Sequence, residues 1–255
     1  MTMPLRDLAH RLLNAAGVEV RLVRNIKAAR LAGKRDQELD AWRILSGRGF
    51  RTVLDIGANE GQFAAIARKL WPQAQVHSFE PLPEVHAKLV ARFQGDPLAH
   101  AHPLALSAES GVTTMHQSAF SPSSSLLPMA EIHRKEWPQS AEHREVEIKL
   151  ERLDDWATGQ GGLEHPLLVK IDVQGYELSV IAGGEKTIRA ADAVVLEVSF
   201  EEFYVGQPLF AGIHDQMRLL GFEYRGNIEQ FTSKDGKRVL FADALFLRNK
   251  HMAVV

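Results

Sequence analysis

The sequence predicts an α/β fold in which helices cover both faces of a parallel sheet. Beyond residue 50, short apolar segments alternate with amphipathic ones, which is the order of strands joined by crossover helices. Acidic residues close several of the apolar segments, as Asp55 does in VLDIGANEG, residues 53–61. Because ligands of such sheets bind outside the carboxyl ends of the strands, these acids mark the edge at which a binding site is expected.

Residues 1–49 are predicted to form a helical N-terminal extension. Apolar residues recur there at helical spacing, and Gly47 and Gly49 suit the end of the last helix. Basic residues are frequent from Arg21 to Arg35, where they form either a solvated helix face or a docking surface for an acidic partner. These helices could also pair with those of a second copy, so a homodimer is one expectation.

Residues 50–255 are predicted to form one domain that carries the sheet. Each predicted strand is an apolar run, and each predicted helix has an apolar face at helical spacing. The predicted strands are residues 51–56, 75–80, 101–107, 167–173, 193–200 and 238–248, and the predicted helices are residues 60–71, 83–93, 176–188 and 210–222.

An insertion at about residues 111–150 interrupts this alternation. Residues 111–128 are rich in Ser and punctuated by Pro, so they are predicted to be loop, whereas residues 144–150 alternate like an exposed strand. Long loops inside compact domains commonly serve as lids or binding segments. The insertion is therefore either a substrate lid or a plain flexible segment.

Composition narrows the class of protein. The 255 residues carry a net charge of −2 and include no cysteine. Disulfides, thiolate metal sites and Cys nucleophiles are excluded, and no basic excess favours nucleic acid as a partner. The N-terminal stretch is too charged for a signal-peptide core, and no apolar run reaches the ~18 residues that span a bilayer. We therefore expect a soluble, cytoplasmic protein without stable membrane insertion.

The turn after the first strand indicates the kind of ligand. A dinucleotide site prefers G-x-G-x-x-G, because pyrophosphate lies against bare backbone at a helix N-terminus. Gly57 and Gly61 are present here, but Asn59 occupies the middle position and Glu60 adds a negative charge. Both features disfavour a diphosphate and favour a cationic or zwitterionic ligand such as S-adenosylmethionine (SAM). A tight turn without a ligand is the plainer alternative.

Further acids end the neighbouring strands. Glu80 closes the second predicted strand, where an acid can accept hydrogen bonds from both hydroxyls of a ribose. Asp172 follows the strand that contains Lys170, and Glu197 lies in the next strand. Because parallel strands end at one edge of a sheet, we expect Asp55 and these three acids to cluster. The alternative is that these four acids simply lie at the starts of the loops and do not form a common site.

Short motifs spread over roughly residues 50–247 together carry a family resemblance. They are VLDIGANEGQF, FEP, ALS, VKIDVQGYE and VVLEVSF, and they resemble the motifs of the FkbM family of SAM-dependent O-methyltransferases. The resemblance implies a Rossmann-like class I methyltransferase fold, with a mostly parallel seven-stranded sheet whose last strand is antiparallel. It also implies methyl transfer to a hydroxyl of a sugar, a glycan or a secondary metabolite. The implied cofactor residues are Asp55, Gly57, Ala58, Asn59, Gly61, Phe79, Glu80, Pro81, Ser107 and Asp172.

Methyl transfer from SAM to an alcohol needs an aligned acceptor and removal of the hydroxyl proton. The candidates for a base or an acceptor anchor are, in order, Asp172, Glu197, Glu201 and His214. His133 and His143 in the insertion are candidates to close over the acceptor, and Tyr204 is expected either in the core or as a wall for a sugar ring. A divalent metal held by Asp172 and Glu197 is a less favoured alternative, since hard oxygen ligands suit such an ion.

Two functions of other classes are kept as alternatives. An NAD-dependent, sugar-modifying oxidoreductase would share Glu80 and the alternating pattern, but Asn59 and the absence of a Tyr-x-x-x-Lys pair count against it. A non-catalytic Rossmann-like binding module would have the same fold without enzymatic activity and would bind a partner protein through the basic residues of the N-terminal extension.

Overall fold

The computed structural model describes residues 39–140 and 143–249 of the chain. The chain divides into two units, residues 1–43 and 44–255, and the elements that form the candidate site lie in the second. Most of the predicted helical extension, including the basic arm and the predicted pairing surface, lies outside the described residues. A 3-10 helix, η1 (Arg43–Arg48), precedes the first strand.

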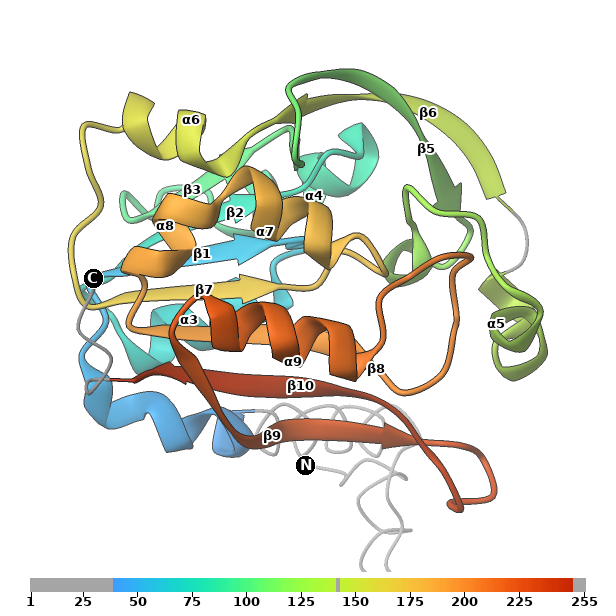
Figure 1. Ribbon diagram of the computed structural model, residues 1–255. Helices are drawn as coiled ribbons and strands as arrows, with labels where there is room; N and C mark the ends of the chain where they lie inside the picture. Colours follow the sequence, from blue (N-terminus) through green and yellow to red (C-terminus); the bar gives the residue numbers. More distant parts are fainter. Residues whose placement is uncertain (1–38, 141–142, 250–255) are drawn as a thin grey trace, which may run out of the picture. The chain divides into compact units, whose positions relative to one another are not determined.

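A seven-stranded sheet forms the centre of the second unit (Figure 1). Its strand order is β3-β2-β1-β7-β8-β10-β9, and β10 is antiparallel to both of its neighbours while the pairs from β3 to β8 are parallel. The predicted α/β fold, with a mostly parallel sheet and an antiparallel last strand, is therefore confirmed. The strands are β1 (Thr52–Ile56), β2 (Gln75–Phe79), β3 (Ala99–His102), β7 (Leu167–Ile171), β8 (Ala193–Ser199), β9 (Phe222–Thr232) and β10 (Val239–Arg248).

The central strands are apolar on both faces because helices cover both faces. Every residue of β1 and β7 is buried, and β8 is buried at every position except Glu197. Burying one aliphatic side chain stabilises the fold by roughly 1.5–3 kcal/mol, so these strands contribute much of its stability. Within them, Asp55 and Lys170 are ionisable groups whose burial is costly without a partner.

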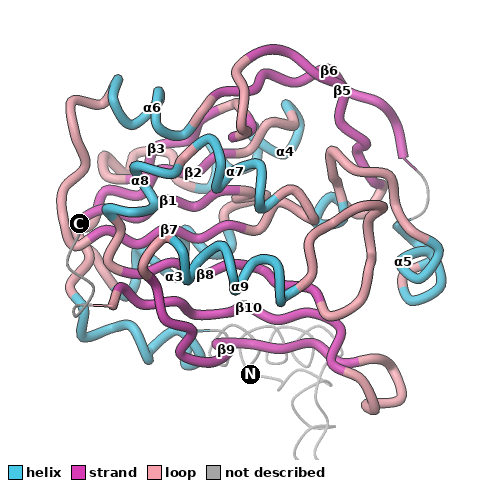
Figure 2. Tube along the Cα trace, viewed as in Figure 1, coloured by secondary structure: helices cyan, strands magenta, loops and turns pink. Residues whose placement is uncertain are grey.

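Helices α7, α8 and α9 lie on one face of the sheet, and α3 and α4 lie on the other (Figure 1 and Figure 2). The helix predicted at residues 176–188 is interrupted at Gly184, which ends α7 and begins α8. Within the described ranges, no helix combines the length and apolar character that a membrane crossing requires. The helices of the domain core are α3 (Gln62–Leu70), α4 (Pro83–Arg92), α6 (Leu153–Gly159), α7 (Glu177–Gly183), α8 (Glu185–Ala190) and α9 (Phe210–Leu219).

The insertion carries its own small sheet. Its strand β5 (Gly111–Ser118) pairs antiparallel with β6 (His143–Glu151), and β4 (Ala105–Leu106) pairs with the other edge of β6. The prediction of loop for residues 111–118 is therefore wrong, because this segment finds a partner strand far along the chain. Ile148 of this sheet packs against Leu82 and Val85 at the start of α4. Between the strands lie η2 (Ser121–Ser123), α5 (Glu131–Glu136) and η3 (Pro138–Ser140).

Candidate active site

The turn after β1 brings bare backbone against the end of β7. Gly57 has φ +83°, and its N–H and that of Ala58 donate to the carbonyl oxygen of Phe79, at 3.1 and 2.9 Å. A Cβ at Gly57 would lie 1.9 Å from the carbonyl oxygen of Asp172. Only glycine, which lacks a Cβ and tolerates positive φ, allows the chain to turn at this distance.

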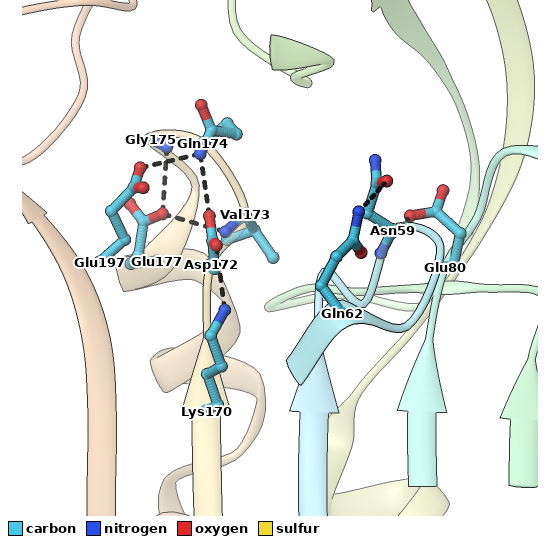
Figure 3. A network of polar contacts seen from close by, with 10 residues as sticks. All are labelled: Asn59, Gln62, Glu80, Lys170, Asp172, Val173, Gln174, Gly175, Glu177 and Glu197. Atoms are coloured by element: carbon cyan, nitrogen blue, oxygen red, sulfur yellow. Dashed lines mark hydrogen bonds and ion pairs between the residues drawn. The ribbon is translucent and has the colours of Figure 1, made fainter. Parts of the chain in front are cut away.

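Glu80 holds the same turn from the neighbouring strand (Figure 3). Its carboxylate accepts hydrogen bonds from the backbone N–H groups of Asn59, at 3.0 Å, and Leu82, at 2.9 Å. Burial raises the pKa of Glu80 to about 7, although these two hydrogen bonds act in the opposite direction. The turn ends at Gly61, which has φ +79° and caps the N-terminus of α3. The predicted turn residues and the predicted ribose acid therefore lie together.

Asp55 is a completely buried carboxyl group in β1. Its exposed fraction is 0 %, and among the described residues neither carboxylate oxygen has a donor in hydrogen-bonding geometry. Burial raises the pKa of Asp55 to about 6, and the charge of Asp172 adds to this, while Lys170 and the nearby N–H of Ala64 lower it. An unsatisfied buried acceptor costs about 1–3 kcal/mol, so an ionised Asp55 without a donor destabilises the folded protein.

The register of the sheet gathers charged side chains on one face. Asp55 is paired with Lys170 across β1 and β7, and Glu197 is paired with Asp243 across β8 and β10. The Nζ atom of Lys170 donates to Oδ2 of Asp172 at 2.9 Å. Burial opposes the charge of Lys170, but the carboxylates of Asp172, Asp243 and Asp55 outweigh burial and raise its pKa. Lys170 is therefore protonated and surrounded by acids.

Gln174 links Asp172 to Glu197 (Figure 3). Its Nε2 atom donates to Oδ1 of Asp172 and to Oε1 of Glu197, both at 2.8 Å. Burial, followed by the charge of Asp172, raises the pKa of Glu197 well above its usual range. The hydroxyl of Tyr204 donates to Oε1 of Gln174 at 2.8 Å. Two carboxylates predicted from separate motifs are thus joined by a single amide.

Two further acids belong to this region and were missed by reasoning from the sequence. Glu177 accepts hydrogen bonds from the N–H groups of Val173, at 3.2 Å, and Gly175, at 3.1 Å, and so shapes the turn after β7. Burial raises the pKa values of Glu177 and Asp243 to about 7 each. Asp243 had a readable signal, because it is a lone acid in the otherwise apolar stretch VLFADALFLR.

The insertion contacts both halves of the site. Ser121 of η2 accepts a hydrogen bond from Nδ2 of Asn59 at 3.1 Å, and the hydroxyl of Ser125 donates to the carbonyl oxygen of Gln174 at 2.6 Å. A cavity of about 120 Å³ lies under the insertion. It is lined by His116, Ser123, Ser125, Leu127, Pro128, Met129, Arg134 and Tyr204.

Three residues predicted to bind the cofactor, Phe79, Pro81 and Ser107, do not place their side chains in the turn after β1. The ring of Phe79 packs against His102 and Trp156 at centroid distances of 4.8 Å, so its carbonyl oxygen, and not its side chain, meets the turn. Pro81 is partly buried next to Glu80. The Ser107 hydroxyl lies 3.4 Å from the hydroxyl of Tyr176, which precedes α7.

The other catalytic candidates are not joined to the Asp172–Glu197 pair. On α9, His214 contacts Phe210 and Tyr224, with ring centroids 5.6 and 6.4 Å away. Glu201 forms an ion pair with Arg238 at 2.8 Å. His133 is buried against the ring of Tyr204, 5.0 Å away, and burial lowers its pKa to about 4. The side chain of His143 lies outside the described part of the chain.

Two electrostatic details refine the sequence-based interpretation. Glu60 forms an ion pair with Lys88 on α4 at 2.7 Å, so a cation lies beside the acid that is expected to repel a phosphate, and this repulsion stays a prediction. Burial raises the pKa values of Asp55, Glu197 and Asp243, and Lys170 is the shared cation whose charge opposes this increase. Across residues 39–140 and 143–249, no three His, Asp or Glu side chains are grouped so as to hold a metal ion.

Comparison with known proteins agrees with this geometry. Residues 55–224 match the methyltransferase FkbM domain family. The chain is 31% identical over 171 residues to 2-O-methyltransferase NoeI of Sinorhizobium fredii, covering 61% of this chain and 66% of that protein. It is 30% identical over 153 residues to methyltransferase sdnD of Sordaria araneosa, covering 51% of this chain and 59% of that protein. The matched part of the chain therefore spans slightly less than two thirds of the length of these relatives.

The solved structures with a similar fold include methyltransferases. One is magnesium protoporphyrin IX methyltransferase from Synechocystis with bound SAM, at 12% identity and a TM-score of 0.47, covering 97% of this chain and 99% of the other. The family match extends from Asp55 in β1 to Tyr224 in β9, so it includes the turn after β1, the acids at the strand ends and the insertion. The chain belongs to the FkbM methyltransferase family.

Proposed function

We propose that this protein is a SAM-dependent O-methyltransferase that transfers a methyl group to a hydroxyl of a small-molecule or glycan acceptor. The observation that carries the proposal is the buried, unpartnered carboxyl group of Asp55 inside a ring of acids that share Lys170 as their cation. Burial raises the pKa values of Asp55, Glu197 and Asp243 even though Lys170 lowers them, so a cationic ligand, which favours their ionised forms, is preferred over an anionic one.

The residues present suit SAM. Asp55 has two buried acceptor oxygens without a donor just before the turn, Gly57 lets the turn pack against the backbone of Asp172, and Glu80 supplies a carboxylate at the end of β2 for ribose hydroxyls. Asn59 and Gly61 shape the turn between them. When bound, SAM would supply an electrophilic methyl group on a positively charged sulfur.

Asp172 is the proposed base or anchor for the acceptor. One of its oxygens is held by Lys170 and the other by Gln174, so the carboxylate is fixed in orientation. Its side chain is 28% exposed, which leaves it accessible from the site. In the proposed reaction the acceptor oxygen forms a bond to the methyl carbon as the carbon–sulfur bond breaks. The hydroxyl proton passes to the Asp172 carboxylate or to water, a contribution typical of general bases.

The acceptor is proposed to enter beneath the insertion. The cavity there is lined by Tyr204 and Ser125, whose hydroxyls donate to Gln174, so Gln174 connects the cavity lining to the Asp172–Glu197 pair. Its lining combines hydroxyls, an imidazole and a guanidinium with apolar side chains, which suits a hydroxylated molecule with some apolar surface.

The first experiment measures cofactor binding. S-adenosylhomocysteine (SAH), the product form of the cofactor, should raise the melting temperature of the wild-type protein through binding to the folded state. Asp55→Asn, which removes the buried charge with little change of shape, should weaken SAH binding at least tenfold in calorimetry. Gln230→Glu, an exposed change on β9, serves as the control and should leave the affinity unchanged.

Two outcomes would contradict the proposal. If NAD raises the melting temperature and saturating SAH does not, the oxidoreductase alternative replaces it. If Asp55→Asn binds SAH as well as the wild type does, the buried carboxylate is not part of the cofactor site. Product mass spectrometry on a panel of sugars, glycans and small hydroxylated metabolites then identifies the acceptor by the gain of one methyl group.

A cytoplasmic location, the absence of a nucleic-acid partner and pairing through the N-terminal helices remain predictions. The net charge of −2 supports the second of these, because nucleic-acid binding usually needs a basic surface. Sedimentation of the full chain with and without residues 1–38 tests the third.

A further inference from the structure

Gln174 is joined by hydrogen bonds to four other residues of the site. Its amide nitrogen donates to Asp172 and Glu197, and its amide oxygen accepts from Tyr204. Its main-chain carbonyl oxygen accepts from the hydroxyl of Ser125 at 2.6 Å. These partners come from the turn after β7, from β8, from the insertion and from the segment after β8, so four parts of the chain meet at one residue.

The backbone at Gln174 has a conformation that usually favours glycine. Its φ is +55°, a left-handed conformation that non-glycine residues rarely adopt. This conformation costs roughly 1–2 kcal/mol for a residue with a Cβ, and glycine would avoid the cost. A turn that only had to reverse the chain would therefore favour glycine here, as at the following residue, Gly175, with φ +95°.

The two acids that Gln174 joins lie in a buried site, where their oxygens need partners. Burial and the charge of Asp172 raise the pKa of Glu197, and Lys170 donates a hydrogen bond only to the Asp172 side of the pair. The amide supplies one N–H to each carboxylate without adding a charge. Burial raises the pKa of Tyr204 above its usual value, so its hydroxyl keeps its proton, and donation of that proton fixes which end of the amide faces the acids.

We propose that Gln174 is a positioning residue for methyl transfer, whose amide holds the carboxylates of Asp172 and Glu197 side by side and orients Asp172 toward the acceptor hydroxyl. The proposal rests on the proposed function of this site. Tyr204 and Ser125, which line the acceptor cavity, hold Gln174 in turn, so an acceptor in that cavity contacts the groups that set the carboxylate pair.

The test is an exchange of amide and carboxylate. Gln174→Glu replaces the donor by a third carboxyl group and should lower the melting temperature at pH 7.5 by about 4–10 °C. In the double variant with Glu197→Gln, residue 174 carries the carboxyl group and residue 197 carries the amide, so the two groups have exchanged positions. The double variant should therefore recover at least half of the loss. Glu197→Gln alone completes the cycle, because contacting residues give non-additive effects.

Gln207→Glu is the matched control. Gln207 is buried near the same turn, and its side-chain Oε1 atom accepts from the backbone N–H groups of Phe203, at 2.8 Å, and Tyr204, at 2.6 Å. A carboxylate can accept the same two bonds, so this variant should lose less stability than Gln174→Glu, and Glu197→Gln should not rescue it.

The catalytic part of the proposal is measured with Gln174→Met, which keeps the size of the side chain and removes its hydrogen bonds. SAH affinity should stay within about twofold of the wild type, because Lys170 still holds Asp172, while kcat with the acceptor from the panel should fall about 10- to 100-fold. Additive stabilities in the exchange cycle, or an unchanged kcat in Gln174→Met, would overturn the proposal. If the wild type fails to bind SAH, the proposed function fails instead, and the exchange cycle still tests the bridge.

Discussion

Gly57→Ala gives the sharpest test of how the candidate site is built. The new Cβ would lie 1.9 Å from the carbonyl oxygen of Asp172, whereas real Cβ contacts essentially never fall below 3.0 Å. The obstructing atom belongs to the backbone, so a side-chain rotation cannot relieve the contact. The turn after β1 must therefore move away from the end of β7 by about 1 Å, the difference between those two distances.

The magnitude has two parts. A positive φ costs an alanine about 1–2 kcal/mol, and overpacking of a close contact costs a further ~1–3 kcal/mol, so a total loss of about 2–5 kcal/mol is expected. Gly95 separates the two parts, because its φ of +86° nearly equals the +83° of Gly57 while a Cβ there would meet nothing within 4 Å. Gly95→Ala should therefore lose only the conformational part, about 1–2 kcal/mol.

Equilibrium urea unfolding is the assay, with the slope of the transition checked for constancy so that midpoints report stability. Gly57→Ala should be less stable than Gly95→Ala, and its folded fraction should bind SAH more weakly because the turn has moved. Equal losses in the two variants would show that the close approach of the turn to Asp172 does not exist in solution. The structural basis assigned to the glycine would then be wrong.

Two further predictions concern stability. His77 stacks with His100 and His102 at 4.8 and 5.4 Å beside Trp156, and burial, with the neighbouring histidines, lowers the pKa values of His77 and His102 from 6.5 to about 3 and about 4. The folded protein binds protons at His77 and His102 less readily than the unfolded chain does. The contribution of these two histidines to the free energy of unfolding is therefore fully present above pH 6.5 and is lost as pH falls toward 4. His77→Phe should therefore show a shallower fall of melting temperature over this range, and a slope equal to that of the wild type would contradict the assignment. Tyr204→Phe removes the donor to Gln174 and the contact with the carbonyl oxygen of Ser123, so a loss of about 1–3 kcal/mol in urea unfolding is expected. A fully stable variant would mean that this hydroxyl does not hold Gln174.

The strand-end acids could be predicted because they depend on local pattern and topology. Asp55, Glu80, Asp172 and Glu197 close or lie in apolar segments, and parallel strands end at the same edge. The structure places all four at the carboxyl ends of β1, β2, β7 and β8 or just beyond them. Their joint location needed no side-chain geometry, only the order and direction of the strands.

Side-chain partners could not be predicted in this way. His133 was a candidate to close over an acceptor, but it is buried against Tyr204 in a cluster with Phe203 and Trp137. Glu60 is expected to repel phosphate, and its ion pair with Lys88 of α4 was not foreseen from the sequence. In both cases the partner comes from a distant part of the chain, so residue type alone does not reveal whether a charge or a ring faces a ligand.

By itself, the sequence determined the alternation of strands and helices, the turn that needs Gly57, and the family to which residues 55–224 belong. These three features depend on periodicity and on short motifs, which can be recognised in the linear sequence. Only the tertiary structure decided that β5 pairs with β6, that Asp243 lies opposite Glu197, and that Gln174 bridges two carboxylates. Such features arise from hydrogen bonds between residues far apart in the chain, and their distances exist only after the chain has folded.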